Sequence, residues 1–327
     1  MTNTVQTQAR SGVVIRRLDQ SDLAEADRIF RLAFGTFLGV PDPLTFTGDA
    51  DVVGSRWRTN PATTLAAEVG GELAGSNFVT LWGSVGFFGP LTVRPDLWDR
   101  GIATSLMEPT LDLFERHGVR HAGLFTFSNS TKHLHLYQKF GFWPRFLTAL
   151  MAKPVAPATA EATPASVSLF SQLNATNRDT ALKECRALTS SIYDGLDVAI
   201  EIEAVQSQHL GDTLLIWDGS RLAGFAVCHC GAGSEAGTGL CFVKFGAVRP
   251  GPAAAADFER LLSECESFAA SRGTGVLLGG INTARHAAYQ SMLAHGFRFG
   301  PLVGVSMHRP GEPGYDRPDT YIIDDWR

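Results

Sequence analysis

The feature that most constrains this chain is an internal repeat. Short motifs recur 155 residues apart: Val93-Arg94-Pro95 recurs as Val248-Arg249-Pro250, Gly118 as Gly273, and Gly141-Phe142 as Gly296-Phe297. A constant separation over so long a segment indicates two tandem copies of one fold. The 327 residues are enough for two domains of ordinary size.

The composition changes between the two copies. Residues 152–166 are rich in Ala and Pro, which is typical of a semi-extended linker. We therefore predict a first domain over 12–154, a linker over 155–166, a second domain over 167–310 and a C-terminal tail over 311–327.

Charge and cysteine content narrow the class of protein. The net charge of −5 argues against a nucleic-acid partner. Residues 1–11 lack an apolar signal core, and the uncharged stretch 73–93 contains glycines that favour two buried strands over a membrane span. Five cysteines, an odd number, fit a reducing cytoplasm. We expect a cytoplasmic protein with no nucleic-acid and no membrane partner.

The pair Cys228 and Cys230, with Cys241 nearby, raises the question of a metal site. No second pair at ligand spacing follows them. We interpret them as buried strand cysteines and expect no metal.

Hydrophobic periodicity predicts the elements of the first copy. We expect strands over 13–18, 64–69, 73–81, 85–93, 121–127 and 146–151, and helices over 23–33, 102–117 and 131–140. Residues 34–51, rich in Gly, Pro, Thr and Phe, are expected to form a loop with room for one short helix, either shaping a substrate pocket or simply lying on the surface.

The junction between the predicted strand 85–93 and the next helix carries the sequence Arg100-Gly101-Ile102-Ala103. Small residues there let the backbone approach a ligand closely. Amides at a helix start have no intrahelical partner, and the helix dipole adds positive charge. The segment can therefore bind phosphate, although a tight strand–helix turn is the plainer interpretation of these residues alone.

Three signals in order resolve that choice. Val-x-Pro followed by Arg-Gly-x-Ala, the later Leu136-Tyr137-Gln138-Lys139-Phe140-Gly141-Phe142 and the opening Ile15-Arg16-Arg17-Leu18 resemble the GNAT superfamily of acyl-CoA-dependent N-acyltransferases over residues 12–154. One departure is Trp98, where the family often has Gln or Arg. The resemblance implies an α/β fold, with a mixed, mostly antiparallel sheet that is flanked by helices and splays at its centre. We expect two tandem GNAT-like domains.

The resemblance also implies the site. Acyl-CoA, most simply acetyl-CoA, would lie in the split of the sheet as co-substrate, with its pantetheine arm along the strand that ends at Val93. The expected contacts are Leu91, Val93, Asp99, Arg100, Gly101, Ile102, Ala103, Thr104 and Asn129. Gly89-Pro90 would form the bulge that opens the sheet. Tyr137 matches the family's general acid, which protonates the CoA sulfur.

The general base stays open. The strand Phe87 to Val93 contains no carboxylate and no histidine, so either a water chain or a residue from elsewhere removes the proton from the amine. His133 and Glu68 are candidates, but a structural role explains each of them more simply.

The second copy lacks the corresponding residues. At the positions that match Arg100, Gly101, Ala103 and Tyr137 it has Ala255, Ala256, Phe258 and Met292. We therefore interpret it as degenerate. We expect it to bury a face of the first copy, to shape the substrate entrance or to form a homodimer.

These observations predict an N-acetyltransferase that acts on a primary amine of a small molecule. The net negative charge suits a cationic acceptor. The alternatives are a non-catalytic acyl-CoA-binding or scaffold protein, and a protein lysine or N-terminus acetyltransferase.

Overall fold

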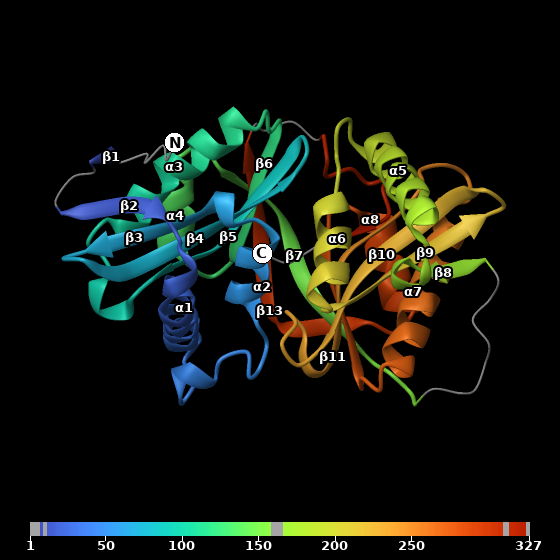
Figure 1. Ribbon diagram of the computed structural model, residues 1–327, viewed down its shortest axis with the longest axis horizontal. Helices are drawn as coiled ribbons and strands as arrows, with labels where there is room; N and C mark the ends of the chain where they lie inside the picture. The colour runs from blue at the N-terminus through green and yellow to red at the C-terminus, as the bar shows by residue number, and fades with distance from the viewer. Residues whose placement is uncertain (1–6, 9–11, 158–165, 310–313, 325–327) are drawn as a thin grey trace.

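A computed structural model describes residues 7–8, 12–157, 166–309 and 314–324. Within these residues, fourteen strands join in one continuous sheet that passes through both halves of the molecule (Figure 1). The predicted linker falls largely on residues 158–165, which lie outside the described part of the chain.

The first half follows the predicted order closely. After the short β1 (Thr7–Gln8), its elements are β2 (Val13–Arg17), α1 (Leu23–Leu38), α2 (Val52–Thr59), β3 (Thr64–Val69), β4 (Glu72–Trp82), β5 (Val85–Val93), α3 (Ile102–Arg116), β6 (His121–Phe127), α4 (Thr131–Gln138) and β7 (Trp143–Pro154). The strands β3, β5 and β6 have the bounds that the periodicity predicts.

The second half repeats this order of elements. It contains β8 (Val167–Leu169), α5 (Ala175–Ile192), α6 (Ala199–Gln208), β9 (Gly211–Asp218), β10 (Arg221–Gly231), β11 (Gly237–Val248), α7 (Ala254–Ser271), β12 (Val276–Asn282), α8 (His286–Ala294) and β13 (Arg298–Arg309). A further short strand, β14 (Ile322–Ile323), follows it.

Helix α1 is longer than the sequence predicts. It continues to Leu38, into the segment expected to be a loop. A glycine such as Gly35 often marks the end of a helix, but here it lies within α1 and allows close packing. A Cβ at this position would lie 2.5 Å from the carbonyl oxygen of Pro43, so glycine lets the returning chain cross the helix closely. The helix α2, which follows, was also not predicted.

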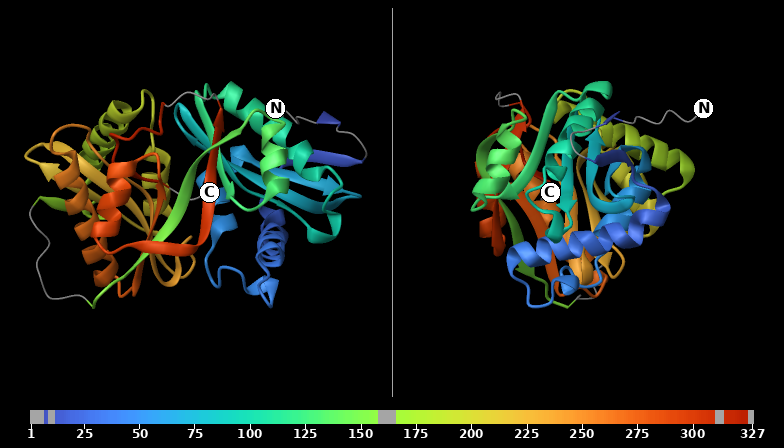
Figure 2. Two further views of the ribbon diagram at one scale, coloured as in Figure 1. Left: turned by 180° about the vertical axis from the view of Figure 1, so that it is seen from behind. Right: turned by 90° about the vertical axis from the view of Figure 1, so that its left-hand side faces the viewer.

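The two halves exchange their last strands. The strand β13 lies between β6 and β7, and β7 in turn pairs with β12; Figure 2 shows the two strands at the centre of the molecule. Met151 on β7 belongs to the core of the second half, whereas Met307 on β13 belongs to that of the first. Neither half completes its sheet with its own residues, and the domain limits drawn from the sequence remain a prediction.

The sheet opens beside β5. This strand pairs in parallel with β6 only over Val85 to Phe87. Two residues, Gly89 and Pro90, then lie opposite the single residue Phe78 of β4, which is the bulge that the sequence predicts. Beyond it, β5 keeps its pairing with β4, and its other edge has no strand partner in the described residues.

The matching place in the second half is filled. The strand β11 pairs in parallel with β12 over Leu240 to Val243. Beyond that point β14 pairs with β11, and the amide of Asp324 donates to the carbonyl oxygen of Gly280 at 3.1 Å. Part of the predicted C-terminal tail thus bridges the gap between β11 and β12.

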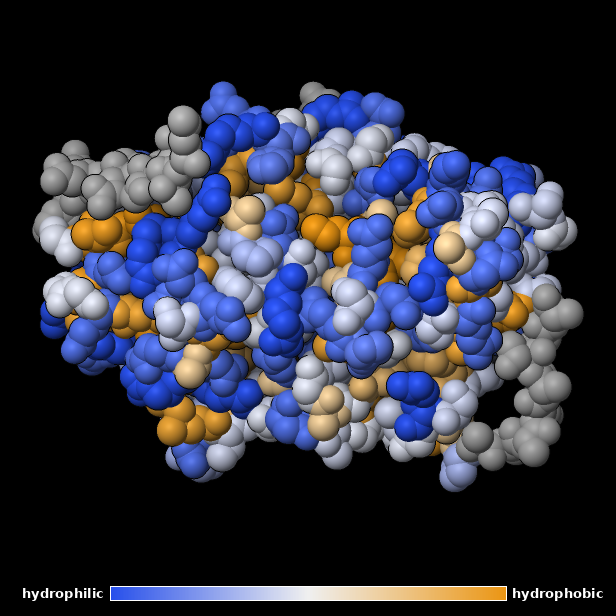
Figure 3. All heavy atoms as spheres, in the orientation of Figure 1, coloured by the Kyte–Doolittle hydropathy of each residue, from blue (hydrophilic) through white to orange (hydrophobic). Residues whose placement is uncertain are grey.

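One face of the molecule is mostly polar (Figure 3). Figure 3 shows a face covered mainly by hydrophilic residues, with apolar residues scattered among them. In the described part of the chain, no helix combines the length and the apolar character that crossing a membrane requires.

Candidate functional site

The loop between β5 and α3 has the backbone conformation of an anion site. Asp99 and Gly101 have left-handed φ angles of +66° and +80°, and Gly101 caps α3. The first helical hydrogen bond runs from Ser105 N–H to the Gly101 carbonyl at 3.1 Å. The amides of the three residues between them therefore lack intrahelical acceptors. A Cβ on Gly101 would meet no atom within 4 Å, so the space in front of the loop is open.

Trp98 anchors this loop. Its indole N–H donates to the carbonyl oxygen of Val93 at 2.8 Å. Lys132 on α4 forms an ion pair with Asp99 at 2.7 Å and lies 5.6 Å from the Trp98 ring centre. The residue that departs from the family pattern thus ties the loop to the end of β5.

The backbone of β5 presents polar groups to the split. Arg94 N–H donates to the Ala74 carbonyl at 2.8 Å, and hydrogen-bonded pairs alternate along an antiparallel ladder. Leu91 and Val93, which lie opposite Asn77 and Gly75, therefore direct their N–H and C=O groups away from β4. These are the two strand positions that the sequence selects for the pantetheine arm.

Tyr137 lies on α4 with its side chain turned into the core. It is 7% exposed, and its ring meets that of Phe88 edge-on at 5.6 Å between centroids. Burial raises the pKa of Tyr137 above its ordinary value, so the phenol keeps its proton. Met292, at the matching place on α8, is fully buried.

The remaining predicted contacts differ in their exposure. Asp99, Arg100, Gly101 and Thr104 are exposed, Ala103 is half-buried and Ile102 is buried. Asn129 is exposed in the turn between β6 and α4. The loop follows directly on β5, and Tyr137 contacts this strand through Phe88.

Neither candidate base has a catalytic setting. Glu68 on β3 forms an ion pair with Arg16 at 2.7 Å. The ring of His133 packs 5.1 Å from that of Phe37, and its buried Nδ1 has no hydrogen-bond partner in the described residues. Burial lowers the pKa of His133. The structure accounts for both residues by packing or ion pairing.

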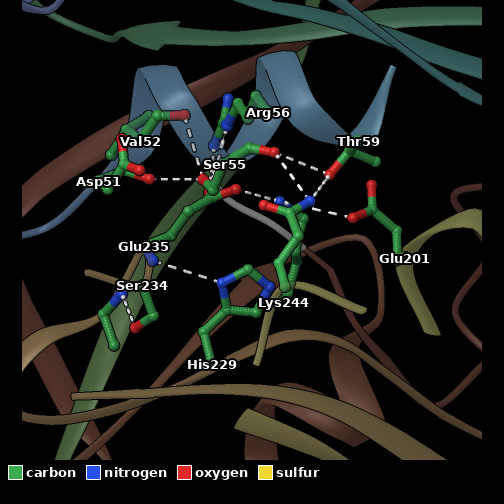
Figure 4. A network of polar contacts seen from close by, with 12 residues as sticks. Asp51, Val52, Ser55, Arg56, Thr59, Glu201, His229, Ser234, Glu235 and Lys244 are labelled. Atoms are coloured by element: carbon green, nitrogen blue, oxygen red, sulfur yellow. Dashed lines mark hydrogen bonds and ion pairs between the residues drawn. The ribbon is translucent and has the colours of Figure 1, made fainter. Parts of the chain in front are cut away.

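Sequence reasoning missed a link between the bulge of β5 and the second half. Arg56 on α2 donates from Nη1 to the carbonyl oxygen of Gly89 at 2.8 Å. The same guanidinium pairs with Glu235, which lies between β10 and β11, at 2.8 Å (Figure 4). No motif marks either residue, and 179 positions separate them.

The second half has no equivalent of the loop. The residue that matches Ile102, the first of α3, is Asp257, but α7 begins three residues earlier at Ala254. An additional helical turn therefore replaces the segment that in the first half holds Gly101. Asp257 also adds a carboxylate to the first turn of α7, which disfavours an anion there. No group of three or more His, Cys, Asp or Glu residues within the described ranges could hold a metal ion.

Comparison with known protein families finds a match within the first half. Residues 28–142 match the model of the acetyltransferase (GNAT) family. This half of the chain therefore contains an acetyltransferase domain of the GNAT family. A comparison with curated proteins finds no match.

Solved structures extend the likeness in fold to the whole chain. A putative acetyltransferase from Pyrococcus horikoshii has a TM-score of 0.68 at 15% identity and covers 98% of this chain and 97% of its own. A GCN5-related N-acetyltransferase from Sphaerobacter thermophilus has a TM-score of 0.57 at 15% identity, with 96% and 100% covered. The N-myristoyltransferase of Saccharomyces cerevisiae, solved with myristoyl-CoA, has a TM-score of 0.62 at 9% identity, with 98% and 80% covered. These likenesses confirm the mixed α/β, GNAT-like fold.

Proposed function

We propose that the protein transfers an acetyl group from acetyl-CoA to a primary amine of a small molecule, and that the first half carries the reaction. The observation that carries the proposal is the continuity of the open edge of β5 with the loop at Gly101. One surface thereby offers groups for a pantetheine arm and for a pyrophosphate.

The roles follow from the chemistry of each group. Exposed amides at the start of α3 hold the pyrophosphate. The N–H groups of Leu91 and Val93 and the carbonyl of Leu91 pair with the pantetheine, and an N–H on this strand stabilises the oxyanion as it forms. Asp99, Arg100, Thr104 and Asn129 line the cofactor's phosphate end.

Two protons move in this mechanism. The amine nitrogen attacks the thioester carbonyl, a C–N bond forms and the C–S bond breaks. The departing thiolate takes the proton of Tyr137, and the amine loses a proton to water, which later restores the phenol. Because burial keeps Tyr137 protonated, it is ready to donate as charge develops on sulfur.

One observation favours a second candidate, an acyl-CoA-binding protein without turnover. Strand β5 carries no carboxylate or histidine, and both alternative bases are held by other contacts. All five cysteines are free, which supports a cytoplasmic location for either candidate.

Thiol release from acetyl-CoA separates the candidates. The intact protein is assayed with polyamines, amino sugars and arylalkylamines, and with peptides that carry a free N-terminus or a lysine. Release that depends on a small amine supports the proposal. Release only with peptides would assign a protein acetyltransferase, and tight acetyl-CoA binding without release would assign the binding protein.

A further inference from the structure

A buried chain of four charged side chains links the two halves (Figure 4). Arg56 pairs with Glu235 at 2.8 Å, Glu235 with Lys244, and Lys244 with Glu201 at 3.6 Å. Each side chain is at most 9% exposed. Two positive and two negative charges alternate along the chain, so each charge has an opposite partner that offsets part of the cost of its burial.

Both ends of the charge chain make a hydrogen bond to a strand of the first half. At one end, Arg56 donates to the carbonyl of Gly89 in the bulge. At the other end, Glu201 accepts a hydrogen bond from the indole of Trp82 at 2.9 Å. Trp82 is the strand partner of Val85, the first residue of β5. Glu201 of the second half thus contacts β4 opposite the start of β5, and Glu235 reaches the bulge through Arg56.

The bulge is the part of β5 that most needs this support. The register with β4 passes from Phe88 to Leu91, so Gly89 and Pro90 have no direct partner on that strand. Gly89 also has a φ of +142°, a backbone conformation that residues other than glycine rarely adopt. The pairing between β4 and β5 does not fix the direction of the Gly89 carbonyl. The hydrogen bond from the guanidinium of Arg56 does so.

Glu235 in turn fixes the guanidinium. The Nε and Nη2 atoms of Arg56 both donate to Glu235 Oε2, at 3.2 and 2.8 Å, while Nη1 is directed at Gly89. A lysine could keep the charge, but it has no planar fork to hold both partners at once.

We propose that Arg56, held by Glu235 of the second half, is a positioning residue for acyl transfer. The inference rests on the proposed function: a pantetheine paired with Leu91 and Val93 places its thioester beside the bulge. By fixing the Gly89 carbonyl, Arg56 sets the point at which β5 separates from β6. The position of the thioester depends on that point. The degenerate half then has a defined role, because the reaction site is incomplete without Glu235.

Three variants of the full chain test this role. Arg56→Met removes the charge and the hydrogen bond, whereas Arg56→Lys keeps the charge alone. Arg58→Met is the matched control, because Arg58 lies on the same helix and also contacts the second half through Gln208 at 3.0 Å, but is 43% exposed. The measurements are kcat for thiol release from acetyl-CoA with the best amine of the panel, the Kd of CoA by calorimetry, the melting temperature, and amide hydrogen exchange over residues 85–93.

We expect both Arg56 variants to lower kcat by about ten- to a hundredfold, because a small misplacement of the reacting group suffices for that loss. The Kd of CoA should change by less than about threefold, because the loop at Gly101 is intact, and exchange over β5 should accelerate. Arg56→Lys should keep a melting temperature close to that of the wild type. Arg58→Met should match the wild type in rate and exchange.

Wild-type kcat in Arg56→Lys, or exchange equal to that of Arg58→Met, would overturn the positioning role. If Arg56→Met does not fold, the lysine variant decides. If the wild type binds CoA without turnover, the proposed function fails, but exchange still decides the positioning: faster exchange in Arg56→Lys than in Arg58→Met supports it, and equal exchange refutes it.

Discussion

Ala247 in β11 is the direct antiparallel partner of Ile322 in β14. The residue that matches Ala247 in the first half is Thr92, which pairs with Ser76 of β4 and has no strand on its other side in the described residues. One copy of the fold thus has an open edge at the place where the other is closed by its own chain. This asymmetry, together with the extra helical turn at Ala254, supports the proposal that acyl-CoA binds to the first half.

Replacing Tyr137 by phenylalanine tests the general acid. The substitution keeps the ring and its contact with Phe88, so acetyl-CoA affinity should change little. Loss of proton donation should lower kcat by about 10²–10⁴-fold and leave KM nearly unchanged. The loss should shrink with a thioester whose leaving thiol is more acidic. Steady-state kinetics with the two thioesters measure this; near-normal kcat would leave Tyr137 as a packing residue.

The same residue predicts a pH dependence. Burial raises the pKa of Tyr137 above its ordinary value near 10, so the proton donor persists as the pH rises. We expect no loss of kcat from phenol ionisation between pH 7 and 10. A fall in kcat over that range that is absent from Tyr137→Phe would show that the phenol ionises there, and so would contradict the raised pKa of Tyr137.

His121 should make stability depend on pH. Burial lowers its pKa to about 4, against about 6.5 in the unfolded chain. The unfolded state therefore binds more protons in this window, and stability falls as the pH drops from about 6.5 to 4, by at most about 3 kcal/mol. Urea unfolding of the wild type and of His121→Gln at pH 7 and 5 measures the difference.

In that comparison, His135→Gln is the control, because His135 is exposed on α4. It should retain the pH dependence of the wild type, whereas His121→Gln should lose much of it. Equal pH dependence in all three proteins would show that His121 is not the titrating group.

Arg285 should anchor the C-terminal segment. It is fully buried and contacts Asp316 at 3.1 Å and Asp324 at 2.8 Å. Arg285→Met leaves two buried carboxylates without their cation, so we expect a loss of about 3–5 kcal/mol in the free energy of unfolding. Arg317→Met, which removes a 35% exposed partner of Asp319, should cost less than about 1 kcal/mol. Similar losses in urea unfolding would show that Arg285 has no special role.

Much of the first half could be predicted because its signals are local. Apolar runs and turn glycines fix strands such as Thr64–Val69 and Val85–Val93, and the constant separation of 155 residues predicts the repeated order of elements. The bulge at Gly89 follows from a proline that cannot donate to a ladder.

The rest depends on contacts between distant parts of the chain. The pattern of Trp143–Pro154 does not specify which half supplies the neighbouring strands, so the exchange of β7 and β13 leaves no trace in periodicity. Two apolar residues at Ile322–Ile323 are too few to predict a strand. Arg56 and Glu235 lie in unrelated segments, and their pairing depends on how the halves pack.

The stoichiometry of CoA binding tests the central claim most directly. Titration calorimetry on the intact protein should give one CoA per chain. Gly101→Asp should abolish binding, because it places a carboxylate against the pyrophosphate and strains a φ of +80°. Gly101→Ala separates the strain from the charge. Ala256→Asp, at the matching exposed position of α7, should leave affinity and stoichiometry unchanged. Two sites per chain, or a single site that survives Gly101→Asp and is lost in Ala256→Asp, would contradict the account.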